Sequence, residues 1–366
     1  QECPWQRLRD IRAQMPNLMT QMLLRASNGV GYTNYPDNVV QAFVAEASKG
    51  IDVFRVFDSL NWVENMRIAM DAVLESGKIC EGTICYTGDI LNPDRSKYNL
   101  KYYVNMAKDL QKSGAHFLGL KDMAGLLKPA AARQLVKALK EEVGLPIHFH
   151  THDTSGIAGA TILAAADAGV DVVDTAMDAF SGGTSQPCMG SVVEALHNSE
   201  RDTGINIENL REISDYWGQV RAQYAAFESG LSSPASEVYL HEMPGGQFTN
   251  LKAQARSMGM EEKWHDIAET YAEVNQMFGD IVKVTPSSKV VGDMALMMVA
   301  QNLNREDVEN PNIEVAFPES VVDMLKGNLG QPPGGFPKHI VTKALKGEKP
   351  NLDRPGKNLD LIDLEK

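Results

Sequence analysis

The sequence predicts an α/β fold built on a parallel sheet, of the kind found in the (β/α)8 barrel. Short apolar segments alternate with helical patterns roughly every 30 residues, the spacing of repeated βα units. These segments are almost continuous in apolar or β-branched residues, as strands covered on both faces must be. Polar side chains follow directly after them, at the strand ends where such a barrel places its active site. After about residue 199 the alternation stops and helical patterns dominate.

The predicted barrel occupies residues 1–200 and contains fewer strands than a closed barrel requires. Strands are predicted at residues 18–24, 53–57, 79–86, 117–120, 147–151 and 172–176, with helices at 39–49, 62–76, 100–113, 130–143 and 157–168 between them. A closed barrel of this type has eight strands. We therefore expect the N-terminal part of the barrel to be missing from the chain.

A second, mainly helical region is predicted over residues 201–345. Its helical patterns cover residues 207–229, 235–243, 250–258, 264–278, 287–302 and 318–325. The glycine- and proline-rich stretch 330–337 predicts a break. Residues 346–366 are rich in Lys, Asp and Pro, which predicts a loosely ordered tail or linker.

Composition narrows the possible partners and compartments. The net charge of −13 argues against nucleic acid or an anionic membrane as the main partner, because both require a clustered positive surface. No apolar stretch approaches the roughly 20 residues of a membrane span, and the N-terminus lacks the features of a signal peptide. A cytoplasmic location is expected. The four cysteines show neither metal-site spacing nor a dense disulfide pattern, so we assign them no chemistry.

The segment HFHTHD, residues 148–153, contains the most informative pair of side chains. His150 and His152 are two residues apart at the end of a predicted strand, so they project from the same face. Two convergent imidazoles suit a divalent metal ion. A histidine pair of this spacing is also common as an ordinary core or surface feature, and the pair alone leaves both interpretations open.

Lys121 follows the fourth predicted strand, where a bare ammonium group is costly unless it is paired or modified. A carbamylated Lys121 would be an anionic oxygen ligand. Together with His150 and His152 it would suit Zn²⁺, Mn²⁺ or Co²⁺. The alternative is an ion pair between Lys121 and Asp122 or Asp153.

Arg25 and Thr285 are two further candidates. Arg25 ends the first predicted strand, and its donor fork suits a carboxylate or an enolate oxygen. A structural salt bridge at the barrel mouth explains it equally well. Thr285 precedes Pro286 at a predicted helix start, where a hydroxyl near the N-cap is common. A threonine hydroxyl held between two reactants can also relay a proton.

Several longer motifs now identify a family. They are GLKDMAGLLKP (119–129), HTHDTSG (150–156), SGGTSQP (181–187), HEMPGGQFTN (241–250) and VTPSSK (284–289). With these motifs in order, the chain resembles the carboxyltransferase domain of pyruvate carboxylases of the bacterial type, a biotin-dependent family, almost from end to end. The resemblance implies that residues 201–345 are the helical carboxylase region that completes the active-site funnel.

The resemblance also implies roles for individual residues. His150, His152 and carbamylated Lys121 would bind the metal ion, most often zinc in such sites, with a fourth ligand from an aspartate expected N-terminal to Gln1. Arg25 would hold pyruvate and its enolate, and Thr285 would relay the proton. Tyr32, Ser288 and Lys289 would line the biotin pocket. The residues that bind substrate or biotin would thus be Arg25, Tyr32, Thr285, Ser288 and Lys289.

The implied reaction transfers a carboxyl group from carboxybiotin to pyruvate and gives oxaloacetate through a metal-assisted enolpyruvate. The implied partners are a biotin carboxyl carrier domain and a biotin carboxylase domain of the same polypeptide, in a homotetramer. Three alternatives stay open: the carboxyltransferase subunit of oxaloacetate decarboxylase or transcarboxylase, a metal-dependent aldol-type lyase on the same barrel, and a non-catalytic docking scaffold.

Overall fold

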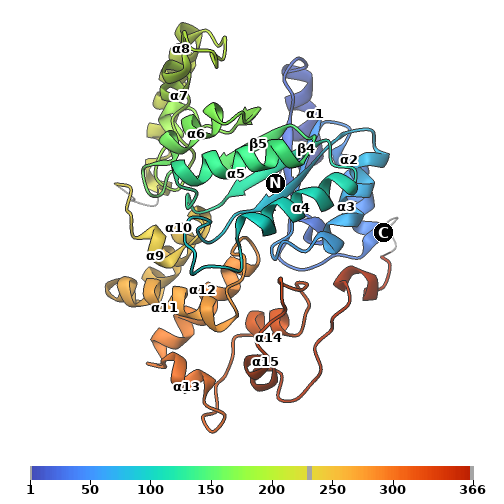
Figure 1. The fold of residues 1–366 in the computed structure, drawn as a ribbon, viewed down its shortest axis with the longest axis vertical. Coiled ribbons are helices and arrows are strands. Elements are labelled where there is room, and N and C mark those ends of the chain that lie inside the picture. The colour runs from blue at the N-terminus through green and yellow to red at the C-terminus, as the bar shows by residue number, and fades with distance from the viewer. Residues whose placement is uncertain (1, 229–232, 363–366) are drawn as a thin grey trace.

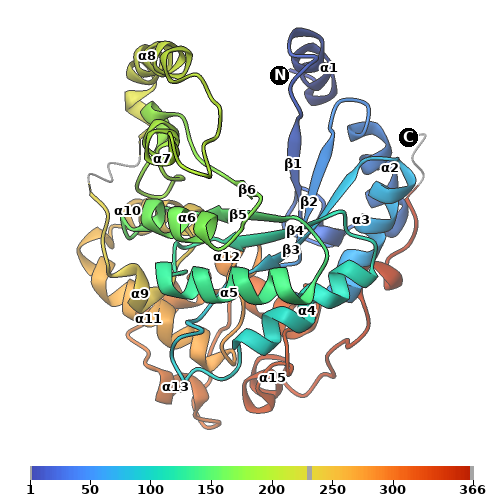
Figure 2. The same ribbon diagram turned by 45° about the horizontal axis from the view of Figure 1, so that its top comes forward.

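The computed structural model describes residues 2–228 and 233–362 and is built on a parallel sheet that curls into half a barrel (Figures 1 and 2). The sheet has six strands in the order β1-β2-β3-β4-β5-β6, so each strand pairs with its neighbour in the chain. The strands are β1 (Gln21–Leu24), β2 (Val53–Val56), β3 (Ile79–Cys85), β4 (Phe117–Asp122), β5 (Ile147–Thr151) and β6 (Val172–Val173). All their pairings are parallel. The predicted α/β barrel-type fold is confirmed, with these six strands in the described part of the chain.

The two edge strands differ most from their predictions. β5 spans the predicted residues, whereas β1 begins at Gln21 instead of residue 18. Leu18 and Met19 are exposed and lie outside the sheet. β6 ends at Val173 instead of residue 176, because Ala176 forms an isolated parallel bridge with Cys188.

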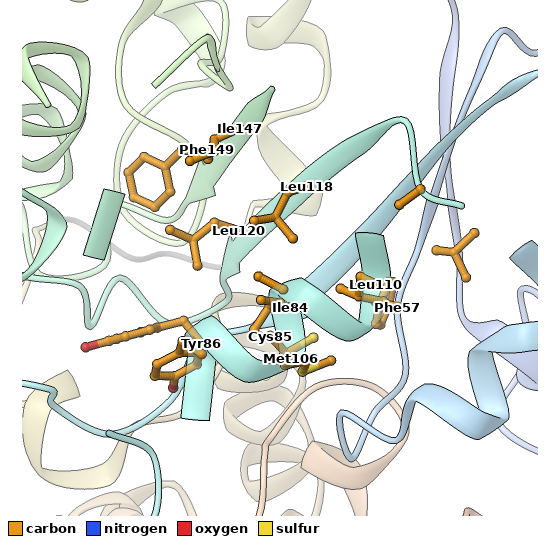
Figure 3. Close-up of a cluster of buried hydrophobic side chains, with 14 of the residues drawn as sticks. Phe57, Ile84, Cys85, Tyr86, Met106, Leu110, Leu118, Leu120, Ile147 and Phe149 are labelled. Carbon is orange, nitrogen blue, oxygen red and sulfur yellow. The ribbon is translucent and has the colours of Figure 1, made fainter. Parts of the chain in front are cut away.

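Helices cover the outer face of the sheet (Figure 2). They are α2 (Asp37–Ala47), α3 (Val63–Glu75), α4 (Leu100–Lys112), α5 (Pro129–Glu142) and α6 (Ala158–Asp167), and they agree closely with prediction. Figure 3 shows Met106 and Leu110 of α4 among the buried side chains of the neighbouring strands, such as Ile84 and Leu118. Each buried side chain of this size contributes roughly 1.5–3 kcal/mol. This apolar layer therefore holds the strands whose ends form the site.

Helices also dominate the C-terminal region, as predicted. They are α9 (Val238–His241), α10 (Gly245–Ser257), α11 (Trp264–Met277), α12 (Ser287–Ala300), α13 (Arg305–Glu309), α14 (Glu319–Leu325) and α15 (Lys338–Ala344). α10 to α15 share a second hydrophobic core, which Leu60 of the barrel joins, whereas Val238 of α9 packs in the core of the barrel. Val282 and Val284 belong instead to the core of the barrel, so the segment before α12 lies against the strands.

Four helices were not predicted: α1 (Pro4–Gln14), α7 (Met189–Leu196), α13 and α15. α1 has no fully buried residue, although Trp5 and Leu8 pack against the core of the barrel. α8 (Ile207–Gln223) ends earlier than predicted, and the predicted end at residue 229 lies outside the described residues. Short 3-10 helices occur at residues 26–28, 178–180, 225–227, 261–263 and 355–358. Across residues 2–228 and 233–362, no helix has the length and apolar character needed to cross a membrane.

The segment 347–362, here termed the strap, differs from the predicted loosely ordered tail. It leaves α15 and runs back along the molecule to α2 of the barrel (Figure 1). Arg354 donates to both carboxylate oxygens of Asp37, at 2.6 Å each. The carbonyl of Ile362 accepts a hydrogen bond from Asn38 at 2.7 Å. Composition did not reveal these contacts because each partner lies more than 300 residues away in the chain.

Candidate functional site

Two imidazoles converge at the C-terminal end of β5. His150 Nε2 and His152 Nε2 are 3.2 Å apart, and the two rings meet edge to face. In a tetrahedral site with zinc–nitrogen bonds of ~2.05 Å, two ligand nitrogens stand roughly 3.3 Å apart. The separation therefore suits a shared metal ion.

The other nitrogen of each ring has its own hydrogen-bond partner. His150 Nδ1 lies 2.7 Å from Asp174 Oδ2, and His152 Nδ1 lies 2.6 Å from the carbonyl oxygen of Thr184. Both partners are acceptors, so Nδ1 is the protonated nitrogen and the Nε2 lone pairs face each other. Burial, reinforced by the charge of Lys121, lowers the pKa of His150 to about 3 and that of His152 to about 4. Both rings are therefore neutral at pH 7 and able to act as ligands.

Asp174, which our sequence interpretation missed, connects His150 to a buried polar cluster inside the half barrel. Its carboxylate accepts from Arg55 at 2.6 Å and lies 2.7 Å from His148 Nε2. His148 Nδ1 lies 2.8 Å from Glu81. Burial alone would raise the pKa of Asp174, but hydrogen bonds from His148 and His150 and the charge of Arg55 hold it well below its usual range. Asp174 is thus a fixed anion that orients His150.

Asp174 left only a weak signal in the sequence. It follows β6 directly, at the C-terminal end of the strand, and the other candidate residues also lie at such strand ends. The short β6, however, gave no alternation from which to predict the direction of its side chain.

Two glycines of the family motifs allow close packing around His152. A Cβ on Gly125 would lie 2.3 Å from the carbonyl oxygen of His152. A Cβ on Gly245 would lie 2.9 Å from His152 Nδ1 and 2.7 Å from the carbonyl oxygen of Thr184. All three distances are shorter than real side chains permit. The start of α10, in the helical C-terminal region, therefore packs directly against the imidazole of His152.

Lys121 lies next to the imidazoles, because it pairs in register with His150 across β4 and β5. Paired residues of neighbouring strands project from the same face. Lys121 is buried, and burial lowers its pKa to about 8. Its Nζ lies 5.4 Å from the centre of the Phe57 ring.

The ion pair considered for Lys121 is not formed among residues 2–228 and 233–362. The Asp122 carboxylate instead accepts from the backbone N–H groups of Leu126 and Leu127, and Asp153 accepts from the backbone N–H of Ala158. In the same part of the chain, no group of three or more His, Cys, Asp or Glu side chains could hold a metal ion.

Arg25 follows β1 and has no carboxylate partner among the described residues. Its Nη1 donates to the carbonyls of Val30 and Gly31 at 2.9 and 3.1 Å. The guanidinium carbon lies 5.7 Å from the centre of the Tyr32 ring. The salt bridge that we considered is therefore absent there, and the guanidinium charge is left available for an anionic ligand.

Thr285 lies in a loop that the helical region inserts against the barrel. Ser287 Oγ lies 3.0 Å from the carbonyl oxygen of Ser59, beyond β2. Lys283 Nζ lies 3.4 Å from Thr87 Oγ1, beyond β3. The loop is thus fixed over two strand ends. α12 begins at Ser287 with Pro286 as its N-cap residue and has no side-chain cap, so the capping interpretation of Thr285 does not hold.

A pocket of about 520 Å³ lies beside this loop. Tyr32, Pro286 and Lys289 line it, which brings two of the predicted biotin-binding residues together. Ser288 does not line it: its hydroxyl is buried and has no hydrogen-bond partner among the described residues. Lys289 Nζ pairs with Asp293 at 2.6 Å. The volume falls in the range typical of small-molecule sites.

Comparison with known proteins agrees with this architecture. An HMGL-like family model matches residues 49–216, which contain β2 to β6. A conserved carboxylase domain model matches residues 238–366, which include α9 to α15 and the strap. A barrel fused to this helical region defines the carboxyltransferase class of proteins.

Individual relatives specify the family. Pyruvate carboxylase of Bacillus subtilis is 53% identical over 365 residues, which are 100% of this chain and 32% of that protein. Human mitochondrial pyruvate carboxylase is 49% identical over 369 residues, 31% of that protein. The carboxyl transferase domain from Rhizobium etli pyruvate carboxylase with pyruvate and biocytin is 69% identical, with a TM-score of 0.98 over 100% of this chain and 62% of that one. The chain belongs to the pyruvate carboxylase family, and it spans about a third of the length of these curated relatives.

Proposed function

We propose that the protein transfers a carboxyl group from carboxybiotin to pyruvate and releases oxaloacetate. The observation that carries the proposal is the convergence of His150 Nε2 and His152 Nε2 at 3.2 Å, beside the buried Lys121. The Rhizobium etli relative was solved with pyruvate and biocytin, which supports the same two reactants for this chain.

His150, His152 and a carbamylated Lys121 would hold a divalent metal ion, with zinc the first choice and manganese or cobalt the others. Two imidazoles and one oxygen form a donor set that suits these ions. The burial of Lys121, without a carboxylate within 4 Å in residues 2–228 and 233–362, supports its modification. When bound, the ion would stabilise negative charge on a substrate oxygen.

Arg25 would hold the carboxylate or the enolate oxygen of pyruvate, because its guanidinium has only neutral carbonyl acceptors in the described structure. Thr285 would relay the proton: its Oγ1 would take a proton from the methyl group of pyruvate and pass its own hydroxyl proton to biotin. The contacts of Ser287 and Lys283 with the barrel support this role, because a relay must be held in place.

Biotin would enter the pocket that Tyr32 and Lys289 line. Ser288 would also contact biotin. Its hydroxyl is buried and has no hydrogen-bond partner in the described residues. A biotin carboxyl carrier domain and a biotin carboxylase domain would be the partners, in a homotetramer and in the cytoplasm. The proposed organisation is a barrel over residues 1–200, a helical region completing the funnel over 201–345, and a tail over 346–366.

The aldol-type lyase and the docking scaffold are weaker candidates. The HMGL-like match ends at residue 216, and a lyase needs neither the carboxylase region at 238–366 nor the VTPSSK segment. A scaffold would bind a biotinylated carrier without turnover. A scaffold does not explain why His150 and His152 converge on one point, and a metal-dependent lyase does not need the buried Lys121 beside them.

The test is oxaloacetate decarboxylation with pyruvate detected, in the presence and absence of free biotin. Biotin-stimulated turnover is the expected result. Arg211→Met is a matched control, because it removes an exposed ion pair with Glu194 on α7 and should leave turnover unchanged. If the chain alone is inactive, the same assay is applied to a chain extended N-terminally to include the expected aspartate ligand. Inactivity of both forms, loaded with metal, would refute the proposal.

A further inference from the structure

The pocket beside Thr285 has an outer wall that comes from the end of the chain. The barrel loop 32–34 and the start of α12 form its inner side. Its remaining lining comes from α14 and the loop after it, and from the strap, through Ser320, Asp323, Asn328, Leu329, Asn351, Pro355, Asn358 and Leu359. Four of these residues belong to the strap. The strap therefore determines the shape of one side of the pocket.

Three groups of contacts attach the strap to the rest of the molecule. At its start, the backbone N–H of Asn351 donates to the carbonyl of Lys326 at 2.7 Å, and Gln331 donates to the carbonyl of Asn351 at 2.9 Å. At its end, Asn38 donates to the carbonyl of Ile362. Between them, Arg354 forms the two parallel bonds to Asp37.

The Arg354–Asp37 pair is the strongest of these attachments. Both bonds are charge-assisted and bidentate, the geometry in which such pairs are strongest. The side chains are only 16% and 25% exposed, so solvent screens them less than a surface pair. Asp37 is also the first residue of α2, where the helix dipole favours a negative charge.

The position of the pair links it to the pocket. Arg354 immediately precedes Pro355, which lines the pocket on the strap side. Asp37 follows the barrel loop 32–34, which also lines the pocket. Asn34 of that loop also donates to the carbonyl of Asn328, another lining residue, at 2.6 Å. The pair thus connects two segments that line the same pocket.

We infer that Arg354 is a positioning residue that holds the strap as a wall of the biotin pocket and so sets the affinity for biotin. The inference rests on the proposed function. It assigns a role in binding to a segment that contributes no side chain to the metal site or to the proton relay.

The test compares Arg354→Met, which keeps the length of the side chain but removes its charge, with Arg354→Lys, which keeps the charge but loses the paired bonds. Both are measured in the protein form that turns over in the decarboxylation assay. Arg354→Met should raise the KM for free biotin about fivefold or more, because one pocket wall loses its main attachment. The KM for oxaloacetate should stay within about twofold, since the metal site is untouched. Arg354→Lys should restore part of the biotin affinity.

Hydrogen exchange of residues 347–362 provides a second readout that is independent of activity. Exchange there should be faster in Arg354→Met, whereas Arg211→Met should change neither exchange nor the KM for biotin. An unchanged KM for biotin in Arg354→Met, or an equal rise in the KM for oxaloacetate, would overturn the inference and leave the proposed function intact. Lack of biotin stimulation in the unsubstituted protein would instead refute the proposed function itself.

Discussion

A buried ion cluster joins the barrel to the helical region, and breaking it should measurably destabilise the protein. Glu242, at the end of α9, pairs with Lys283 at 3.1 Å and also with Arg95 from the loop after β3. The side chains of Lys283 and Glu242 are 2% and 9% exposed. Burial tends to raise the pKa of Glu242, but the charges of Lys283 and Arg95 outweigh it and lower the pKa below its usual value. The carboxylate is therefore ionised at pH 7.

The perturbation is Glu242→Gln, which keeps the shape of the side chain and removes its charge. Lys283 then stays buried with only neutral partners, Thr87 Oγ1 and the carbonyl of Ile281, both at 3.4 Å. Removing one partner of a buried pair costs ~3–5 kcal/mol. With an unfolding entropy of ~2.1 cal/mol/K per residue, the 366 residues give ~0.77 kcal/mol/K, so the melting temperature should fall by roughly 4–6.5 °C.

The assay is a double-mutant cycle followed by thermal and urea unfolding. The double variant Glu242→Gln/Lys283→Met removes both buried charges of the pair. Arg95 still has its ion pair with Asp280, at 3.5 Å. The double variant should be more stable than either single variant, with an interaction energy of ~2–3 kcal/mol. The exposed-pair control Arg211→Met should change stability by less than ~1 kcal/mol. Additive single effects, within ~0.5 kcal/mol, would refute the reasoning.

Three further variants test the site and its surroundings. Thr285→Ala should lower turnover by roughly 10²–10⁴-fold with metal content unchanged, and retained turnover would exclude the relay. Asp174→Asn should weaken metal binding by roughly 10–100-fold in a chelator competition, because His150 loses its orienting anion; equal affinity would contradict that role. Burial lowers the pKa of His241 to about 4 from 6.5, so the unfolded state binds the proton first as the pH falls. Through this group stability should therefore drop by up to ~3 kcal/mol between pH 6.5 and 4. His241→Asn, which can still accept from Met243, should make the fall of the urea midpoint over that range smaller, with His150 and His152 contributing the remainder.

Local patterns in the chain were enough to predict the barrel strands and their helices. Continuous apolar runs and amphipathic helices depend on neighbouring residues, so their periods appear directly in the sequence. The same holds for His150 and His152, because residues two apart in a strand share a face wherever the strand lies. The position of Lys121 beside them followed once the strands were placed in parallel order.

Only the tertiary structure decided which distant groups meet at these strand ends. Asp174 orients His150 because β6 pairs with β5 in the register that sets the two residues side by side. The loop with Thr285 reaches the barrel because Ser287 and Lys283 find partners beyond β2 and β3. The contact between Asp37 and Arg354 spans 317 residues. Such contacts form when packing of the whole chain offsets the entropy of closing long loops, and no local period records that balance.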